Sequence, residues 1–384
     1  MSSYIESYIK QKKKLRSFQQ NEFRQLNKCL EDHRSLDAEN IVVPLYSMDI
    51  VPETITRRGT TYLIYDLHFF YYIQQFITNL TLIRVGHERN GSRYLPELLE
   101  EIKFNLYYYL VCVNYKNTIA CLGFLECYKG APEKIKPSVK NDNWFIDLFL
   151  YFSHLYVMRH EIAHSFFKTE RSSHNKSILK GHLMDLVKLF NQGEFKTSNS
   201  QRSVVENSNV TLSEDNEIAS FISQAVADEQ SLLFEEVFCD WQAFNDLMII
   251  INTKHSDKPS LHYRAARLLE LFDQINDFLR NLSTITDNIL YNKEPASGPS
   301  ANILRYTIGK LLRQLMIAQT QPSAIGAIDT DFDEQVDYCQ RVIYKFIYPK
   351  LEEIVTDDEL FTNIAEATIS LVDAERIRDE YLGW

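Results

Sequence analysis

The chain has 384 residues, of which 45% are hydrophobic and 12% are aromatic, a composition that fits a sizeable folded core and excludes a disordered protein. The formal net charge of −11 argues against nucleic acid as the main partner, because the overall field of the protein repels phosphate groups. The first residues lack the apolar core of a signal peptide, no apolar run approaches the ~18 residues of a membrane span, and six cysteines occur without a CxxC pair. We therefore expect a cytoplasmic protein without a membrane partner.

The first part of the chain shows both helical and strand patterns. Residues 4–36 are polar and contain no Gly or Pro, which predicts an exposed helix. β-Branched residues on both sides of Arg58-Gly59 predict a hairpin over residues 53–65. The short apolar segment 118–128 fits either a strand or the end of a buried helix, since periodicity does not separate the two. Further helices are expected over residues 67–80 and 95–113.

The second part of the chain is expected to be almost entirely helical. A pattern without Gly or Pro runs from Trp144 to about Lys168, and the Ser- and Asn-rich residues 191–216 fit a flexible polar insertion. Helical patterns return at residues 217–252 and again from Pro259. Three more helices are expected near the end of the chain, the last one over residues 359–381.

Together these patterns predict an α+β fold that is mostly α-helical and contains a small antiparallel sheet. The hairpin supplies the sheet, with segment 118–128 as a candidate further strand. We divide the chain into an N-terminal helical extension (1–45), a core (46–275) that includes the polar insertion, and a C-terminal helical region (276–384).

The strongest chemical signal is the sequence His160-Glu161-Ile162-Ala163-His164, within a long predicted helix. Residues i and i+4 share one face of a helix, so both imidazoles can bind one zinc ion at Zn–N distances of ~2.0–2.1 Å. Glu161 then lies beside the metal-bound water, where it can act as a general base. The spacing predicts one zinc ion per chain, with His160 and His164 as ligands.

A catalytic zinc site also needs a third protein ligand. Glu236 and Asp240 are one turn apart in a later predicted helix, so Glu236 is the candidate ligand. Asp240 is then the candidate partner for the second ring nitrogen of a zinc-bound imidazole. Glu235 is the alternative ligand. His174 and His182 are explained equally well by a polar surface loop.

HEIAH followed by EEVFCD resembles the gluzincins, a class of zinc metallopeptidases that includes thermolysin and the CAAX prenyl proteases. Residues 258–268 are similar to the HPxxxxRxxxL segment of the prenyl protease-like families, with matches at Pro259, Arg264 and Leu268 and with Lys258 in place of their His. The order of the motifs also resembles that of the phage-exclusion protein Lit. The resemblance covers about residues 60–270 and implies a gluzincin-like core in which an edge strand binds the substrate.

The resulting hypothesis is a zinc-dependent endopeptidase that hydrolyses a specific intracellular protein. Arg264, His262 and Tyr263 are candidates to stabilise the oxyanion, because they lie on the helix after the one that carries Glu236. A regulatory protein partner and, from the resemblance to Lit, a role in antiviral defence belong to the same hypothesis. Two alternatives stay open: a zinc-bound interaction module without catalysis, and a helical scaffold in which the HExxH arose by chance.

Overall fold

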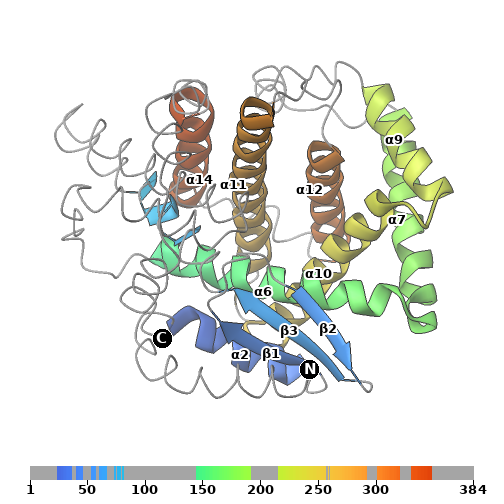
Figure 1. Ribbon diagram of the computed structural model, residues 1–384, viewed down its shortest axis with the longest axis horizontal. Helices are drawn as coiled ribbons and strands as arrows, with labels where there is room; N and C mark the ends of the chain where they lie inside the picture. Colours follow the sequence, from blue (N-terminus) through green and yellow to red (C-terminus); the bar gives the residue numbers. More distant parts are fainter. Residues whose placement is uncertain are drawn as a thin grey trace.

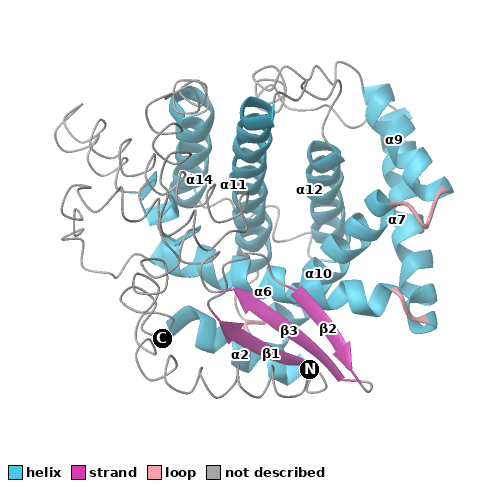
Figure 2. Ribbon diagram, viewed as in Figure 1, coloured by secondary structure: helices cyan, strands magenta, loops and turns pink. Residues whose placement is uncertain are grey.

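The computed structural model describes residues 24–36, 40–45, 53–57, 60–66, parts of 73–81, 144–191, 215–291 except 257 and 259, 301–320 and 330–347. These residues are mostly helical and include one small sheet (Figure 1, Figure 2). In chain order the elements are α2 (Arg24–Leu36), β1 (Ile41–Leu45), β2 (Glu53–Arg57), β3 (Thr60–Asp66), α6 (Trp144–Phe167), η3 (Glu170–Ser172), α7 (Ser173–Asn191), α9 (Asp215–Ala227), α10 (Leu232–Lys254), α11 (Ser260–Tyr291), α12 (Ala301–Thr320), α14 (Thr330–Val342) and η4 (Ile343–Ile347). The segments predicted as helices at 95–113 and 359–381 and as a candidate strand at 118–128 lie outside the described residues.

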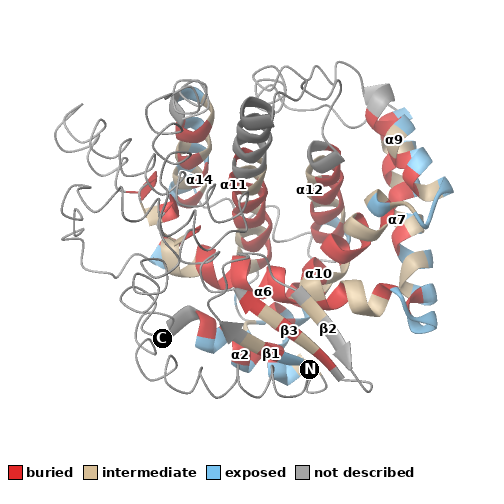
Figure 3. Ribbon diagram, in the orientation of Figure 1, coloured by how far each residue is buried: buried red, intermediate tan, exposed pale blue. Residues whose placement is uncertain are grey.

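Helix α6 lies at the centre of the packing, and most of its length is buried (Figure 3). It contains no Gly or Pro, as the sequence predicted, and the side chains of Phe149, Phe152 and Leu155 are almost completely buried. α6 packs most extensively against α10 and also contacts α2, α11 and the sheet. A helix that is enclosed in this way holds the polar side chains near its C-terminal end in fixed positions.

The sheet has the strand order β1–β3–β2 and is mixed. β2 and β3, which flank Arg58-Gly59, pair antiparallel, whereas β1 pairs with β3 in parallel. The predicted hairpin is thus confirmed, whereas the prediction of an antiparallel sheet is wrong because β1 pairs in parallel. Strand β1 was not predicted, and its Pro44 is a residue that argues against a strand. β1 is at the edge of the described sheet, which is where a proline within a strand is usually found.

The sheet is joined to α6 by a buried polar contact. The hydroxyl of Tyr65 in β3 is 2.7 Å from Nδ1 of His154 in α6, and both side chains are buried. Burial lowers the pKa of His154 well below its ordinary value, so this imidazole is neutral. His154 therefore holds the sheet against α6.

Helix α10 begins later than the sequence pattern indicated. The helical patterns predicted over residues 217–252 form two helices, α9 and α10, separated by a turn at residues 228–231. Ser231 is the N-cap of α10, where its hydroxyl accepts a hydrogen bond from the backbone N–H of Phe234 at 3.2 Å. This cap lies one turn before Glu235 and Glu236 and so fixes the part of α10 that carries them.

Three further sequence predictions can be compared with the described residues. His174 and His182 lie in helix α7 and not in a surface loop. The predicted boundary at residue 275, between the core and the C-terminal region, falls inside helix α11. Helix α2 packs against α6, and helix α12 packs against α10. The division into three regions stays a prediction. None of the described helices combines the length and the hydropathy that crossing a bilayer requires.

Candidate metal centre

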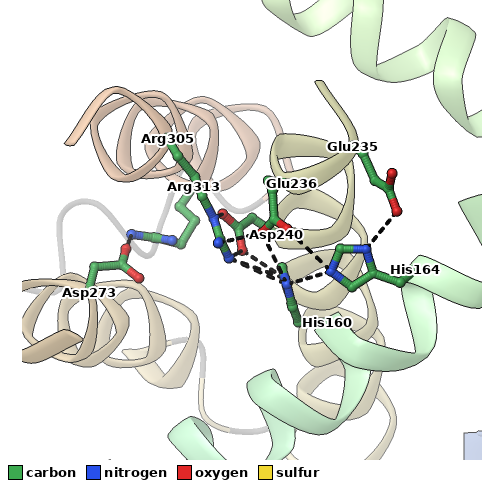
Figure 4. Close-up of polar contacts among 8 residues, drawn as sticks. All are labelled: His160, His164, Glu235, Glu236, Asp240, Asp273, Arg305 and Arg313. Carbon is green, nitrogen blue, oxygen red and sulfur yellow. Dashed lines mark hydrogen bonds and ion pairs between the residues drawn. The ribbon is translucent and has the colours of Figure 1, made fainter. Parts of the chain in front are cut away.

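Two packed helices, α6 and α10, bring the three predicted metal ligands together. His160 and His164 lie one turn apart on α6, and their Nε2 atoms are 3.1 Å apart. Glu236 on α10 faces both rings, with Oε2 3.5 Å from Nε2 of His160 and Oε1 3.6 Å from Nε2 of His164. These three residues form a group that could hold a metal ion (Figure 4).

Carboxylates hold both imidazoles through their other ring nitrogens. Nδ1 of His160 is 2.9 Å from Oδ1 of Asp240, and Nδ1 of His164 is 2.9 Å from Oε1 of Glu235. A carboxylate accepts hydrogen bonds, so each Nδ1–H donates, and a ring in its neutral form has a bare Nε2. Asp240 thus lies where its spacing from Glu236 predicted, and Glu235 orients an imidazole on the side away from the proposed metal position.

The convergence of these acceptors fits a bound cation. The two Nε2 atoms and the Glu236 carboxylate face one another over 3.1–3.6 Å. Arg305 pairs with Oε2 of Glu236 and its Nη2 is 3.4 Å from Nε2 of His160, and a proton or a metal ion would satisfy the acceptors that remain. Two imidazole nitrogens and one carboxylate oxygen are a ligand set that zinc takes at catalytic sites.

The side chains of the group shift one another's pKa values. Burial and Arg305 oppose the protonation of His160, but its hydrogen bonds to Asp240 and Glu236 outweigh them and raise its pKa to about 9. Burial also opposes the ionisation of Glu236, yet the hydrogen bond to His160 and the charge of Arg305 lower its pKa to about 2. The pKa of Asp240 lies well below its ordinary range, since Arg305 and His160 outweigh its burial. In the metal-free protein these two carboxylates are therefore balanced by Arg305 and by the protonated His160, and a bound cation would take the place of the His160 proton.

Glu161 lies next to the metal group without being part of it. Burial raises the pKa of its carboxyl above the ordinary value, and the charges of His160 and His164 act against this rise. Among the residues that the structure describes, Glu161 has no hydrogen-bond or ion-pair partner. Its carboxylate is thus available to accept a proton from water, and a raised pKa suits a general base.

The sequence reasoning missed Arg305 on α12. Its Nε and Nη2 atoms are 2.6 and 2.7 Å from the two carboxylate oxygens of Asp240, and its Nη1 forms an ion pair with Oε2 of Glu236 (Figure 4). The Arg305 side chain is buried, with 10% of its surface exposed. The sequence feature that could have indicated Arg305 is a spacing of four residues between Arg305, Gly309 and Arg313, which places them on one face of a largely apolar helix.

The structure does not bring the three oxyanion candidates to this group. His262 lies at the start of α11, where its Nε2 donates to Oδ1 of Asn252 over 2.9 Å. Asn252 is sixteen residues from Glu236 on α10, which corresponds to about 24 Å along the helix. The first turn of α11 therefore lies beside the far end of α10.

The other two candidates have partners at the same distant end. The hydroxyl of Tyr263 donates to Oδ1 of Asp333 on α14 over 2.9 Å. The guanidinium of Arg264 lies over the ring of Trp144 at 5.4 Å from its centroid. Trp144 begins α6, sixteen residues or about 24 Å before His160. The prediction that one of these residues stabilises an oxyanion is corrected. The start of α11 lies beside the end of α10 and the beginning of α6, and the metal group lies at the opposite ends of these two long helices.

No family model matches the chain, and neither a curated protein nor a solved structure is significantly similar to it. The resemblance to gluzincins rests on the short motifs alone.

Proposed function

We propose that the chain is a zinc-dependent endopeptidase with His160, His164 and Glu236 as metal ligands and Glu161 as general base. The observation that carries the proposal is the convergence of two Nε2 atoms and one carboxylate, with each imidazole held from behind by a further carboxylate. A zinc ion bound by these residues would polarise the scissile carbonyl and lower the pKa of water at the site.

The number of ligands favours a catalytic over a structural zinc site. Structural zinc is almost always enclosed by four protein ligands, whereas catalytic zinc has three and an open position. Within the part of the chain that the structure describes, the metal-binding group consists of His160, His164 and Glu236 and includes no fourth His, Cys, Asp or Glu. This observation supports an enzyme rather than a zinc-bound interaction module.

Glu161 supplies the proton transfers in this proposal. Its carboxylate accepts a proton from the attacking water and passes it to the leaving amine, so the same group acts first as a base and then as an acid. The lack of a described ionic partner and the raised pKa both support this role.

The sheet offers a way to bind an extended peptide. β2 is at the edge of the described sheet, and both β2 and β3 pack against α6, the helix that carries the HExxH. A peptide can add to such an edge by main-chain hydrogen bonds. We propose a protein or peptide substrate bound in this way.

The proposal is tested by Glu161→Gln. Gln has nearly the same shape as Glu but cannot accept the proton, so cleavage should fall ~10²–10⁴-fold while the zinc content is unchanged. Wild-type protein is incubated with extracts of the source cells, and new protein N-termini are counted by mass spectrometry. Glu170→Gln, at an exposed position just after α6, is the matched control and should cleave like wild type.

Two outcomes would contradict the proposal. Equal cleavage by wild type and Glu161→Gln would show that Glu161 is not the base. Stoichiometric zinc without any cleavage, in extracts of both normal and stressed cells, would favour the interaction module.

A further inference from the structure

We propose that Arg305 is a positioning residue that holds one oxygen of Glu236 and leaves only the other oxygen for the metal. This inference rests on the metal site proposed above, but it concerns the coordination of the ligand and not the cleavage of a substrate. It assigns a function to α12, which contains none of the motifs recognised in the sequence.

All three guanidinium nitrogens of Arg305 are used by two carboxylates on α10. Nε and Nη2 bind Asp240 in a two-point contact at 2.6 and 2.7 Å, and Nη1 pairs with Oε2 of Glu236. Asp240 and Glu236 are one turn apart, so the planar fork of a single Arg spans both. A lysine, with one ammonium group on a flexible stem, cannot reproduce this pattern.

Both oxygens of Glu236 lie near a proposed ligand, but only one of them is paired with Arg305. Oε2 pairs with Arg305 and is 3.5 Å from Nε2 of His160, whereas Oε1 is 3.6 Å from Nε2 of His164. Because Oε2 is held by a cation, Oε1 is the oxygen that remains for a metal ion. Rotation of the carboxylate to offer both oxygens would break the contact with Nη1 of Arg305.

The position of α12 is itself fixed close to α10. Gly309, one turn after Arg305, lies so near that a Cβ built on it would be 4.0 Å from Oδ2 of Asp240 and 3.4 Å from Arg313. Arg313, a further turn along, forms a buried ion pair with Asp273 of α11 at 2.5 Å (Figure 4). Arg305 is thus presented by a helix that is held at a second point, and not by a loose segment.

The consequence concerns the open position of the site. A catalytic zinc ion needs one place that no protein atom occupies. A Glu236 that bound through both oxygens would take up part of that space. By holding Oε2, Arg305 keeps the contribution of Glu236 to a single oxygen.

The experiment uses Co²⁺ as the probe in the full chain, because the visible bands of Co²⁺ weaken when its coordination rises from four to five. The variants are Arg305→Gln, which removes the charge, and Arg305→Lys, which keeps the charge but loses the fork. We expect intense bands for wild type and weaker bands for both variants. Circular dichroism verifies that each is folded, and Arg305→Lys provides the test if Arg305→Gln does not fold.

Arg159→Gln is the matched control. Arg159 is adjacent to His160 and makes a similar contact between α6 and α10, with Nε and Nη2 at 2.6 and 2.5 Å from Asp246 rather than from a proposed ligand. Its Co²⁺ spectrum should equal that of wild type. A weakening in this variant as large as in the Arg305 variants would contradict the inference.

The inference is overturned if folded Arg305→Lys keeps the wild-type spectrum, since charge alone would then be sufficient. It is also overturned if wild type binds no Co²⁺, an outcome that removes the proposed metal site as well. A wild type with intense bands that cleaves no protein would reject the peptidase but leave the role of Arg305 intact.

Discussion

Asp240→Asn separates the two tasks that the structure gives to one buried carboxylate. Asp240 accepts from Nδ1 of His160 at 2.9 Å and binds Arg305 at 2.6 and 2.7 Å, with only 3% of its side chain exposed. Asn keeps the shape and one acceptor oxygen but loses the charge. We expect both weaker metal binding and lower stability.

The sizes of the two effects follow from these contacts. Loss of a group that orients a metal-bound imidazole lowers metal affinity ~10–100-fold, or about 1.4–2.7 kcal/mol. The amide oxygen still accepts from His160, so we expect a value near tenfold. Breaking a buried ion pair costs about 3–5 kcal/mol, and the remaining contact of Arg305 with Glu236 places the loss near 3 kcal/mol.

The assay combines urea unfolding of the metal-free protein with competition for zinc against a coloured chelator. Asp246→Asn is the control, because Asp246 is also a buried carboxylate on α10 paired with an arginine, Arg159. It should lose similar stability and keep wild-type zinc affinity. If both variants bound zinc equally well, Asp240 would not orient a metal ligand.

Two further predictions concern pH. Metal-free His160 has a pKa raised to about 9 and must lose its proton to bind metal. The apparent zinc affinity should therefore rise about tenfold per pH unit up to about pH 9. A zinc affinity that calorimetry finds unchanged between pH 7 and 9 would contradict this prediction. The pKa of His154 is lowered on folding, so the unfolded chain takes up the proton first and stability is lost as pH falls below ~6.5. The urea midpoint of wild type should therefore fall more steeply with acid than that of His154→Gln, and equal slopes would refute a neutral buried imidazole.

The parts of the site that the sequence predicted are those set by local spacing. His160 and His164 share a face of α6 because one helical turn separates them, and the same rule placed Glu236 and Asp240 on one face of α10. The packing of these two helices was inferred only from the chemistry that would join them. The bounds of α6 were predicted almost to the residue, since the helix has no breaker, whereas the cap at Ser231 was not recognised within a continuous helical pattern.

The parts that failed depend on where distant segments meet. Arg264 has a place in a recognisable motif, but the direction of α11 carries it to Trp144 and away from His160. Strand β1 was not predicted, and its proline is compatible with a strand only at the edge of a sheet, a position that depends on the other strands. Neither outcome is encoded in local periodicity, because each depends on which neighbour the folded chain supplies.

Arg305 shows why charge balance is a better guide to such residues than motif spacing. Once His160, His164, Glu235, Glu236 and Asp240 are placed, two imidazoles face three carboxylates in a largely buried setting. Ionised carboxylates are seldom buried without a cation or a dense set of donors, so the cluster requires positive charge beyond what the imidazoles supply. A metal ion would satisfy the face where the two Nε2 atoms and Glu236 converge, but Oδ2 of Asp240 is not part of that group and binds Arg305. A second, permanent cation is therefore needed on that side, and an arginine is the side chain whose fork can bind Asp240 at two points and still contact Glu236.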